Sequence, residues 1–409
     1  MDSIYQQYTL QNGIRLVHKQ TQSRIAHCGI MINAGTREEE KKENGLAHFL
    51  EHCFFKGTEK RKAFHILNRM DSVGADLNAY TSKEETCFHA SFLTEYYDRT
   101  LDLFSDIIFH SVFPEKEIER EKTVVIDEIN SYLDDPSEMI FDEFELQLFK
   151  GHPIGQLTLG KESNILKFKS ENLRKFILKH YTCDQIVISS VGNIPFKQFI
   201  KFAERYFGGI QNSSQNSIRS PFSNYQPITE IKRKRTNQTH CIIGNIAYDH
   251  YHPLKTALTL LNNILGGPSM NSRLSLHIRE KHGLTYQIGS NYSPFSDTGL
   301  FTIYMGTAHS LEKTLDLVEK ELGILRNQKM GTLQLTSAKK QLIGQVALGF
   351  DSNLNEMISM AKSTLIFKKI DSIEEISQKI EDVTAEQLQD VAQEVFDVEK
   401  FSRLIYTSK

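Results

Sequence analysis

The 409-residue sequence contains no tryptophan, no Cys-x-x-Cys pair and no apolar run that approaches the 18 residues of a membrane-spanning helix. The first residues also lack a basic region followed by an apolar core, so a secretory signal is not expected. These absences lead us to expect a cytoplasmic protein without a membrane partner.

The five cysteines are odd in number and scattered along the chain, which argues against both a disulfide framework and a four-cysteine zinc site. We expect reduced thiols at Cys28, Cys53, Cys87, Cys183 and Cys241. Cys53 directly follows His52 and could be mistaken for a metal ligand. Neighbouring helical residues point about 100° apart, so Cys53 is better interpreted as a packed hydrophobic residue.

An excess of one charge is also lacking, because 48 Lys and Arg residues face 51 Asp and Glu residues, for a net charge of −3. This balance does not favour nucleic acid as a partner. The basic run at 232–235 has no interleaved aromatic residues and is better explained as an exposed strand edge. The charged run at 38–43 has mixed signs and is expected to be a solvated loop.

The sequence His48-x-x-Glu51-His52 is the first pattern that indicates chemistry. Histidines four residues apart project from one face of a helix and can supply two corners of a tetrahedral zinc site. Glu51 lies close to that face and can approach a coordinated water without being a ligand. This order is the H-x-x-E-H motif. His and Glu at this spacing can also occur by chance on a solvated helix face, so the motif alone does not establish a metal site.

A second helix is predicted over residues 115–133, opened by Pro114. Glu121 and Glu128 lie seven residues apart in it, nearly two turns, and therefore face the same way. Glu128 could complete a His₂Glu zinc site, and Glu121 could hydrogen-bond one of the ligands. From periodicity alone, a solvent-exposed position of both glutamates on the polar face of the helix is favoured over a role in a metal site.

The order of predicted elements repeats along the chain, as strand, helix, strands, helices and strand. The stretch at 211–230 is rich in Ser, Asn, Gln and Pro and reads as a linker. We therefore expect half-domains at 1–210 and 231–409, which suggests a duplication. In the second half, helices are predicted at 254–265, 272–281, 311–325, 336–350, 353–367 and 385–395.

These segments together resemble the pitrilysin/insulinase family of zinc metallopeptidases, especially its short bacterial members similar to mitochondrial processing peptidase. The resemblance covers essentially the whole chain. The family places a glutamate ligand some 75 residues beyond the second histidine, and 75 residues separate His52 from Glu128. The matching segments are 45–52, 55–58, 78–82, 121–128, 152–155, 159–160, 272–274, 278–286, 291–292 and 297–301.

The resemblance implies one Zn²⁺ per chain, held by His48, His52 and Glu128, with Glu51 as general base and then general acid on the fourth-position water. Glu121 matches a family acidic residue and is placed with the catalytic group. The implied fold class is α+β, with two similar half-domains, each a mixed, mainly antiparallel β-sheet with helices packed on one face.

The resemblance also assigns Arg279 and Tyr286, in the second half, as substrate and oxyanion contacts. Asn78 and Ala79 would border a sheet edge to which a peptide main chain adds. Without the resemblance these residues have plain explanations: Arg279 caps a helix, Tyr286 starts a strand, and the other two lie in a turn.

The predicted function is that of a zinc-dependent endopeptidase that cleaves peptides or unfolded polypeptides inside a clamshell chamber. Family members enclose the chamber with four half-domains, so a chain that supplies two implies a dimer, most simply a homodimer. Alternatives are a catalytically silent peptide-binding member, a heterodimer subunit that provides only the zinc, or a metal-dependent hydrolase of another substrate class. Whether Arg279 and Tyr286 act on the zinc of their own chain or of a partner stays open.

Overall fold

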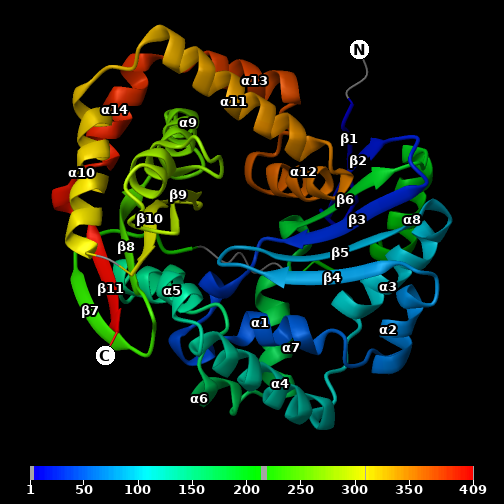
Figure 1. Cartoon of the computed structure of the whole chain (residues 1–409). Helices are drawn as coiled ribbons and strands as arrows, with labels where there is room; N and C mark the ends of the chain where they lie inside the picture. Colours follow the sequence, from blue (N-terminus) through cyan, green and yellow to red (C-terminus); the bar gives the residue numbers. More distant parts are fainter. Residues whose placement is uncertain (1–3, 213–218, 309, 409) are drawn as a thin grey trace. The chain divides into compact units, whose positions relative to one another are not determined.

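The computed structural model describes residues 4–212, 219–308 and 310–408, which form two compact units (Figure 1). Neither unit is a continuous stretch of chain. Unit 1 comprises Met1–Ser131, Gln156–Arg219 and Gly349–Ile370, and unit 2 comprises Tyr132–Gly155, Ser220–Leu348 and Asp371–Lys409. The units differ from the half-domains expected at 1–210 and 231–409 because each half gives one segment to the other unit. Tyr132–Gly155 belongs to unit 2, and Gly349–Ile370 belongs to unit 1. Of the expected linker at 211–230, residues 213–218 lie outside the described residues.

Unit 1 is built on a six-stranded sheet in the order β1-β2-β6-β3-β5-β4. The β2–β6 pair is parallel and every other pair is antiparallel. Strands β3 and β6 are apolar and buried over almost their whole length, as expected for central strands covered on both faces. The strands are β1 (Gln6–Thr9), β2 (Arg15–Gln20), β3 (Ile25–Ile32), β4 (Asp76–Thr81), β5 (Thr86–Leu93) and β6 (Ile186–Gly192).

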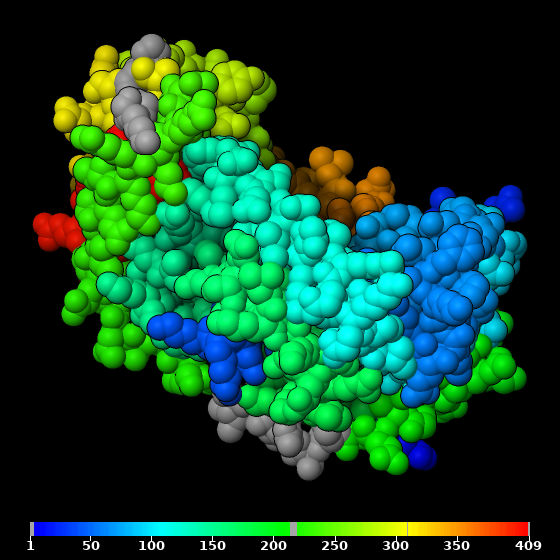
Figure 2. Space-filling view, turned by 90° about the horizontal axis from the view of Figure 1, so that it is seen from below, coloured from blue at the N-terminus to red at the C-terminus, as the bar shows by residue number. Residues whose placement is uncertain are grey.

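One face of this sheet packs against helices in a core rich in phenylalanine, including Phe49, Phe54, Phe88 and Phe104. Helices α2 and α4 lie at the surface of unit 1, where Figure 2 shows them in blue and cyan. The helices of unit 1 on this side are α1 (Leu46–Cys53), α2 (Ala63–Asp71), α3 (Tyr97–Phe109), α4 (Glu115–Leu133), α6 (Glu162–Ile165), α7 (Ser170–His180) and α8 (Phe196–Phe207).

The other face of the sheet is covered by α12 (Asn353–Phe367), the exchanged segment from the second half. Met357 packs so closely on Gly29 that a Cβ atom there would meet its sulfur at 2.8 Å. The carboxylate of Glu356, 2% exposed, receives two hydrogen bonds of 2.7 Å from Lys19 and one of 3.0 Å from Tyr5. Apolar packing and an ion pair with the buried carboxylate of Glu356 therefore both hold α12 on the sheet.

Unit 2 contains a five-stranded sheet in the order β7-β11-β8-β10-β9, in which only β7 and β11 pair in parallel. Numbered within each half and leaving out β1, both sheets have the strand order 1-5-2-4-3. The predicted α+β fold of two similar halves with mixed, mainly antiparallel sheets is therefore confirmed. The strands are β7 (Thr229–Lys234), β8 (Thr239–Ala247), β9 (Gln287–Pro294), β10 (Gly299–Thr307) and β11 (Ser402–Ser408).

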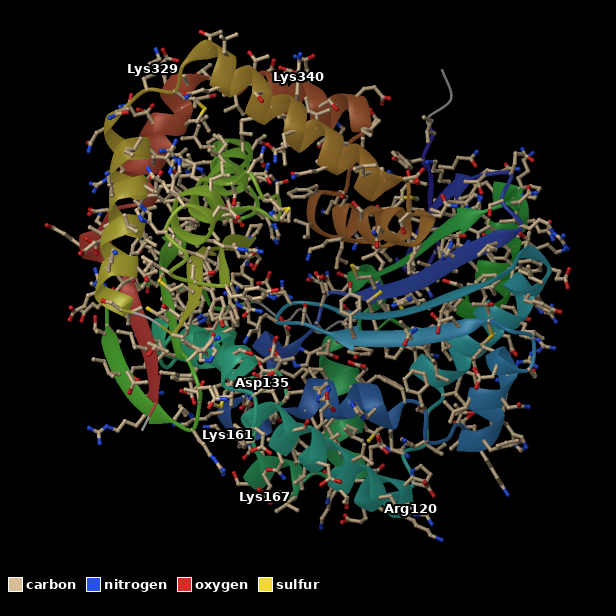
Figure 3. All side chains as sticks on the ribbon, viewed as in Figure 1. Arg120, Asp135, Lys161, Lys167, Lys329 and Lys340 are labelled. Carbon is tan, nitrogen blue, oxygen red and sulfur yellow. The ribbon has the colours of Figure 1, made fainter. Side chains whose placement is uncertain are left out.

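Unit 2 also has helices on both faces of its sheet. Helix α5 (Pro136–Leu148), the segment exchanged from the first half, packs Ile140 and Phe144 against Ile242 and Leu404. Asp135, labelled in Figure 3, caps this helix by accepting a hydrogen bond from the backbone N–H of Ser137. The remaining helices are α9 (Lys255–Gly266), the π-helix η6 (Ser275–Glu280), α10 (Leu311–Asn327), α11 (Thr332–Phe350), α13 (Ile373–Glu381) and α14 (Ala385–Val395).

Two further observations bear on the expectations from composition. All five cysteines are free and buried, as predicted for reduced thiols. Within the described part of the chain, no helix combines the length and the apolar character needed to cross a bilayer.

Candidate metal centre

Helix α1 carries the His48-x-x-Glu51-His52 motif, and specific contacts of the residues around Gly45 determine where it begins. Gly45 precedes it with φ of +98°, a left-handed conformation that favours glycine, and packs against Gly160 so closely that a Cβ atom would meet its Cα at 2.8 Å. The carboxylate of Glu39 accepts hydrogen bonds from the backbone N–H groups of Gly45 at 2.9 Å and Ala47 at 2.7 Å. These contacts satisfy donors that the first turn of a helix leaves open.

The expectation that residues 38–43 form a solvated loop is wrong for Glu39, which is only 2% exposed. Burial raises the pKa of Glu39 to about 8, although the N–H donors of Ala47 and Gly45 act in the opposite direction. The sequence gives no sign of this role because the carboxylate reaches the helix from six residues before Gly45. A charged run can thus contain the buried cap of a functional helix.

Three predicted ligands converge in unit 1. Nε2 of His48 lies 3.7 Å from Oε1 of Glu128, and Nε2 of His52 lies 3.5 Å from Oε2 of the same carboxylate. One ligand atom from each of the three residues lies within 4.8 Å of the other two, and no other such group of His, Cys, Asp or Glu is found among the described residues. Ligands at about 2.1 Å from a tetrahedral zinc ion stand roughly 3.4 Å apart, so these side chains fit zinc closely.

Glu121 is not part of the ligand group but forms a hydrogen bond with His52, which is. Its Oε1 lies 2.9 Å from Nδ1 of His52, and its Oε2 lies 2.6 Å from Nζ of Lys56. Burial alone would raise the pKa of Glu121, but the hydrogen bonds with His52 and Lys56 lower it below its ordinary value. An ionised carboxylate at this place accepts the Nδ1–H of His52 and leaves the Nε2 lone pair facing Glu128.

His48 is buried and neutral. Burial, and to a smaller extent the neighbouring His52, lower the pKa of His48 to about 4, so its Nε2 is free to ligate a metal at neutral pH. Its Nδ1 finds no hydrogen-bond partner among the described residues. The two histidines are therefore held differently: His48 by packing, and His52 by a carboxylate.

Glu51 lies on the same helix and outside the ligand group. Its Oε2 accepts a hydrogen bond of 2.6 Å from the hydroxyl of Thr81, the last residue of β4. Burial raises the pKa of Glu51, against the opposing effect of the Thr81 bond. Thr81 and Lys56 were not expected from the sequence to have a role, although both lie in segments that carry the family resemblance. Residues that hydrogen-bond to Glu51 or Glu121 stand at no fixed spacing from the motif, so the sequence does not identify them.

Asn78 and Ala79 lie on β4, an edge strand of the unit 1 sheet. Among the described residues β4 pairs with β5 alone. Asn78 donates to both carboxylate oxygens of Asp76 at 2.9 Å. Asn78 and Ala79 therefore lie on a strand at the edge of the sheet, as expected, and not in a turn.

Arg279 and Tyr286 lie in unit 2, whereas the ligand group lies in unit 1. The guanidinium of Arg279 stands over the ring of Tyr286, 5.3 Å from its centroid, and the tyrosine side chain is 75% exposed. Both line a cavity of about 440 Å³ together with Gln238 and Thr285. The pair thus forms one exposed cation–π unit.

Comparison with protein families gives two matches that together cover most of the chain. The insulinase family, peptidase family M16, matches residues 15–162, and the peptidase M16 inactive domain matches residues 167–342. The first match contains the ligand group and the second contains Arg279 and Tyr286.

Similar proteins extend the match to nearly full length. The uncharacterized zinc protease YmxG of Bacillus subtilis is 35% identical over 392 residues, 95% of each chain. An uncharacterized zinc protease of Rickettsia felis is 32% identical over 90% of this chain and 89% of its own. The uncharacterized zinc protease SCO5738 of Streptomyces coelicolor is 30% identical over 95% of this chain and 86% of its own.

Two solved structures share the fold. A protease from Helicobacter pylori has a TM-score of 0.92 at 20% identity, over 98% of this chain and 99% of that one. A peptidase M16 inactive domain from Pseudomonas fluorescens also has a TM-score of 0.92 at 20% identity, over 99% and 98% of the two chains. The match of fold, family segments and full-length relatives leads to one conclusion: the chain belongs to the insulinase family of peptidases, family M16.

Proposed function

We propose that this chain is a zinc-dependent endopeptidase that cleaves peptides or unfolded polypeptides. The observation that carries the proposal is the cluster of His48, His52 and Glu128 ligand atoms at zinc spacing, with the Glu51 carboxylate beside it on the same helix. The relatives named zinc proteases support the choice of metal. One zinc ion per chain is proposed, since the described residues hold a single group of this kind.

The three ligands would present two neutral imidazole nitrogens and one carboxylate oxygen to the metal, a set typical of catalytic zinc. Bound there, zinc would supply a Lewis acid that polarises the scissile carbonyl and lowers the pKa of a water. Glu121 keeps His52 in the tautomer that ligates through Nε2, because its carboxylate accepts the Nδ1 proton.

Glu51 is proposed as the group that moves the proton. Its carboxylate removes a proton from the attacking water and delivers that proton to the nitrogen of the leaving amine. Thr81 fixes one oxygen of Glu51 by a 2.6 Å hydrogen bond and leaves the other for this transfer. The raised pKa of Glu51, caused by burial, increases its affinity for the proton that it must hold between the two steps.

Arg279 and Tyr286 are proposed to donate hydrogen bonds to the oxyanion and to the substrate, from unit 2 of this chain or of a partner chain. The substrate main chain would add to the edge of β4 at Asn78 and Ala79, where the ladder has no further strand among the described residues. A homodimer that encloses a chamber is proposed on the family resemblance, since one chain supplies two sheet domains.

The substitution Glu51→Gln tests this function. It should keep one zinc ion per chain and reduce cleavage of a quenched peptide library by at least about a hundredfold, the low end of general acid–base contributions. Glu119→Gln, on the exposed face of α4, is the matched control and should cleave at the wild-type rate. Wild-type activity in Glu51→Gln would sink the proposal.

The catalytically silent and heterodimeric alternatives predict a different outcome for the purified wild-type chain. A silent member would bind zinc or peptide without cleaving any member of the library. A heterodimer subunit would elute as an inactive monomer in size-exclusion chromatography and gain activity only on addition of a second protein.

A further inference from the structure

Strand β7 forms an open edge of the unit 2 sheet. Among the described residues it pairs with β11 alone, over six consecutive residues, and no strand lies on its other side (Figure 1). The carbonyl of Ile228 accepts a hydrogen bond of 2.8 Å from the backbone N–H of Arg403, so it points toward β11. Since main-chain groups alternate along a strand, those of Thr229, Ile231 and Arg233 point away from β11, toward the open side.

The first half of the chain shows what fits at such an edge. Strand β2 holds in the unit 1 sheet the place that β7 holds in the unit 2 sheet, and both pair in parallel with the last strand of their half. On the other side of β2 the chain adds β1 in antiparallel register, with Tyr8 opposite Leu16. In the described part of unit 2 that place is empty, so an additional antiparallel strand fits the fold beside β7.

The exposed face of β7 carries an apolar side chain followed by two cations. Ile231 is 66% exposed. Arg233 and Arg235, which directly follows the strand, are also exposed and form no ion pair with any described residue. Free main-chain groups and unpaired positive charge therefore occur together along this edge.

The opposite face of β7 is already paired within unit 2. Nζ of Lys232 lies 2.7 Å from Oε2 of Glu143 on α5, and Nζ of Lys234 lies 3.2 Å from Oε1 of the same carboxylate. The chain's own helix holds both lysines, so an added strand meets unpaired charge only at Arg233 and Arg235.

Charge decides which kind of strand this edge accepts. Charged side chains on an edge commonly prevent pairing with other chains. A second copy would bring the same basic run, and like charges opposite each other destabilise a strand pair, whereas opposite charges stabilise it. The β7 edge therefore disfavours pairing with itself and favours an acidic strand. It also contains no proline that would remove an outward N–H group.

We propose that the β7 edge binds an extended acidic segment of another protein as an additional, antiparallel strand. The residues of that segment opposite Arg235 and Arg233 are acidic, and the residue opposite Ile231 is apolar. Because the two strands run in opposite directions, the segment reads acidic-x-acidic-x-apolar from its N-terminal end. This interaction goes beyond the proposed peptidase function and does not depend on it.

A fluorescein-labelled peptide that contains Glu-Thr-Glu-Thr-Val-Thr tests the proposal by fluorescence anisotropy. The full-length protein carries Glu51→Gln so that the peptide stays intact. We expect Arg233→Glu to raise the Kd at least about tenfold. Arg24→Glu makes the same change of charge at an exposed position of unit 1 and should leave the Kd unchanged. A peptide with lysines in place of the glutamates should bind at least about tenfold more weakly.

N-methylation of the peptide distinguishes an added strand from binding by charge alone. The peptide residues opposite Arg233 and Ile231, its second glutamate and its valine, turn their N–H groups toward β7. Methyl groups on these two nitrogens should raise the Kd at least about tenfold. Methyl groups on the two threonines that follow them face away from β7 and should leave the Kd unchanged. This comparison uses one protein, so no variant has to fold.

An unchanged Kd in Arg233→Glu would overturn the proposal, as would equal binding of the two methylated peptides or of the lysine peptide. Binding of single-stranded RNA or of phosphatidylserine vesicles through Arg233, without binding of the acidic peptide, would also overturn it. None of these measurements requires cleavage. The proposed peptidase function can therefore fail while the β7 assignment stands, and a peptidase that does not bind the acidic peptide would show the reverse.

Discussion

Nδ1 of His52 lies 2.9 Å from Oε1 of Glu121, and the second oxygen of that carboxylate is bound by Lys56 at 2.6 Å. A long helix, α4, thus supplies both the third ligand of the candidate centre and the acceptor that orients one of its histidines. Residues seven apart on α4 act in different ways because Glu121 is buried and paired with a cation, whereas Glu128 is exposed.

Removal of the orienting carboxylate should weaken metal binding without abolishing it. For Glu121→Ala we expect zinc affinity to fall about 10- to 100-fold, since His52 loses the acceptor that fixes its tautomer. Competition with a chromogenic chelator measures the change, and Glu119→Ala on the exposed face of α4 serves as the control. Equal zinc affinity in Glu121→Ala and wild type would contradict the role of this carboxylate.

The ion pair between the buried Glu356 and the partly exposed Lys19 should hold the exchanged helix α12 on the unit 1 sheet. Glu356→Ala removes the acceptor of the two Lys19 hydrogen bonds and should lower the free energy of unfolding by about 1.5–3 kcal/mol, as for hydrogen bonds to charged groups, since the Lys19 side chain is partly exposed. Urea unfolding followed by circular dichroism measures this loss.

The control for this experiment is Glu386→Ala, which breaks an exposed ion pair with Lys329. Lys329 is labelled in Figure 3. The effect of Glu386→Ala on the free energy of unfolding should be much smaller than that of Glu356→Ala, because solvent screens an exposed pair. Equal effects of the two substitutions would show that α12 is not anchored through Glu356.

Glu39 should make stability depend on pH. Because burial raises its folded-state pKa to about 8, the folded protein binds a proton there between about pH 4.5 and 8 that the unfolded chain has lost. The stabilising contribution is thus complete below pH 4.5 and is lost as pH rises through 8. Relative to Glu39→Gln, the free energy of unfolding of wild type should fall by up to about 1.4 kcal/mol per pH unit in this window.

Urea unfolding of both proteins between pH 5 and 8 checks the sign of this dependence. A difference between wild type and Glu39→Gln that stays constant with pH would show that Glu39 is ionised in the folded protein. The N–H groups of Gly45 and Ala47 would then outweigh the effect of burial.

The elements that carry the ligand group could be predicted from sequence because their signals are local. The i, i+4 histidines lie on a helix, and the helices predicted over 115–133 and 353–367 have the bounds of α4 and α12. The sequence does not reveal which of the two sheets an amphipathic helix covers, because its apolar face can pack against either sheet. Helices α5 and α12 therefore each belong to the compact unit formed mainly by the other half of the chain, and α5, α6, α7 and α13 were not predicted as helices.

Side chains that act through tertiary contacts were missed for the same reason. Thr81, Lys56 and Glu39 reach the candidate centre or its helix from a strand end, a turn and a loop, where no periodicity links them to the motif.

The central claim is that His48, His52 and Glu128 together hold one zinc ion. Anomalous diffraction at the zinc edge from crystals of the Glu51→Gln protein, grown with zinc, tests it most directly. We predict one anomalous peak per chain, about 2.0–2.2 Å from Nε2 of both histidines and from a Glu128 oxygen. A crystal without a peak there, or with zinc bound only elsewhere in the chain, would contradict the account.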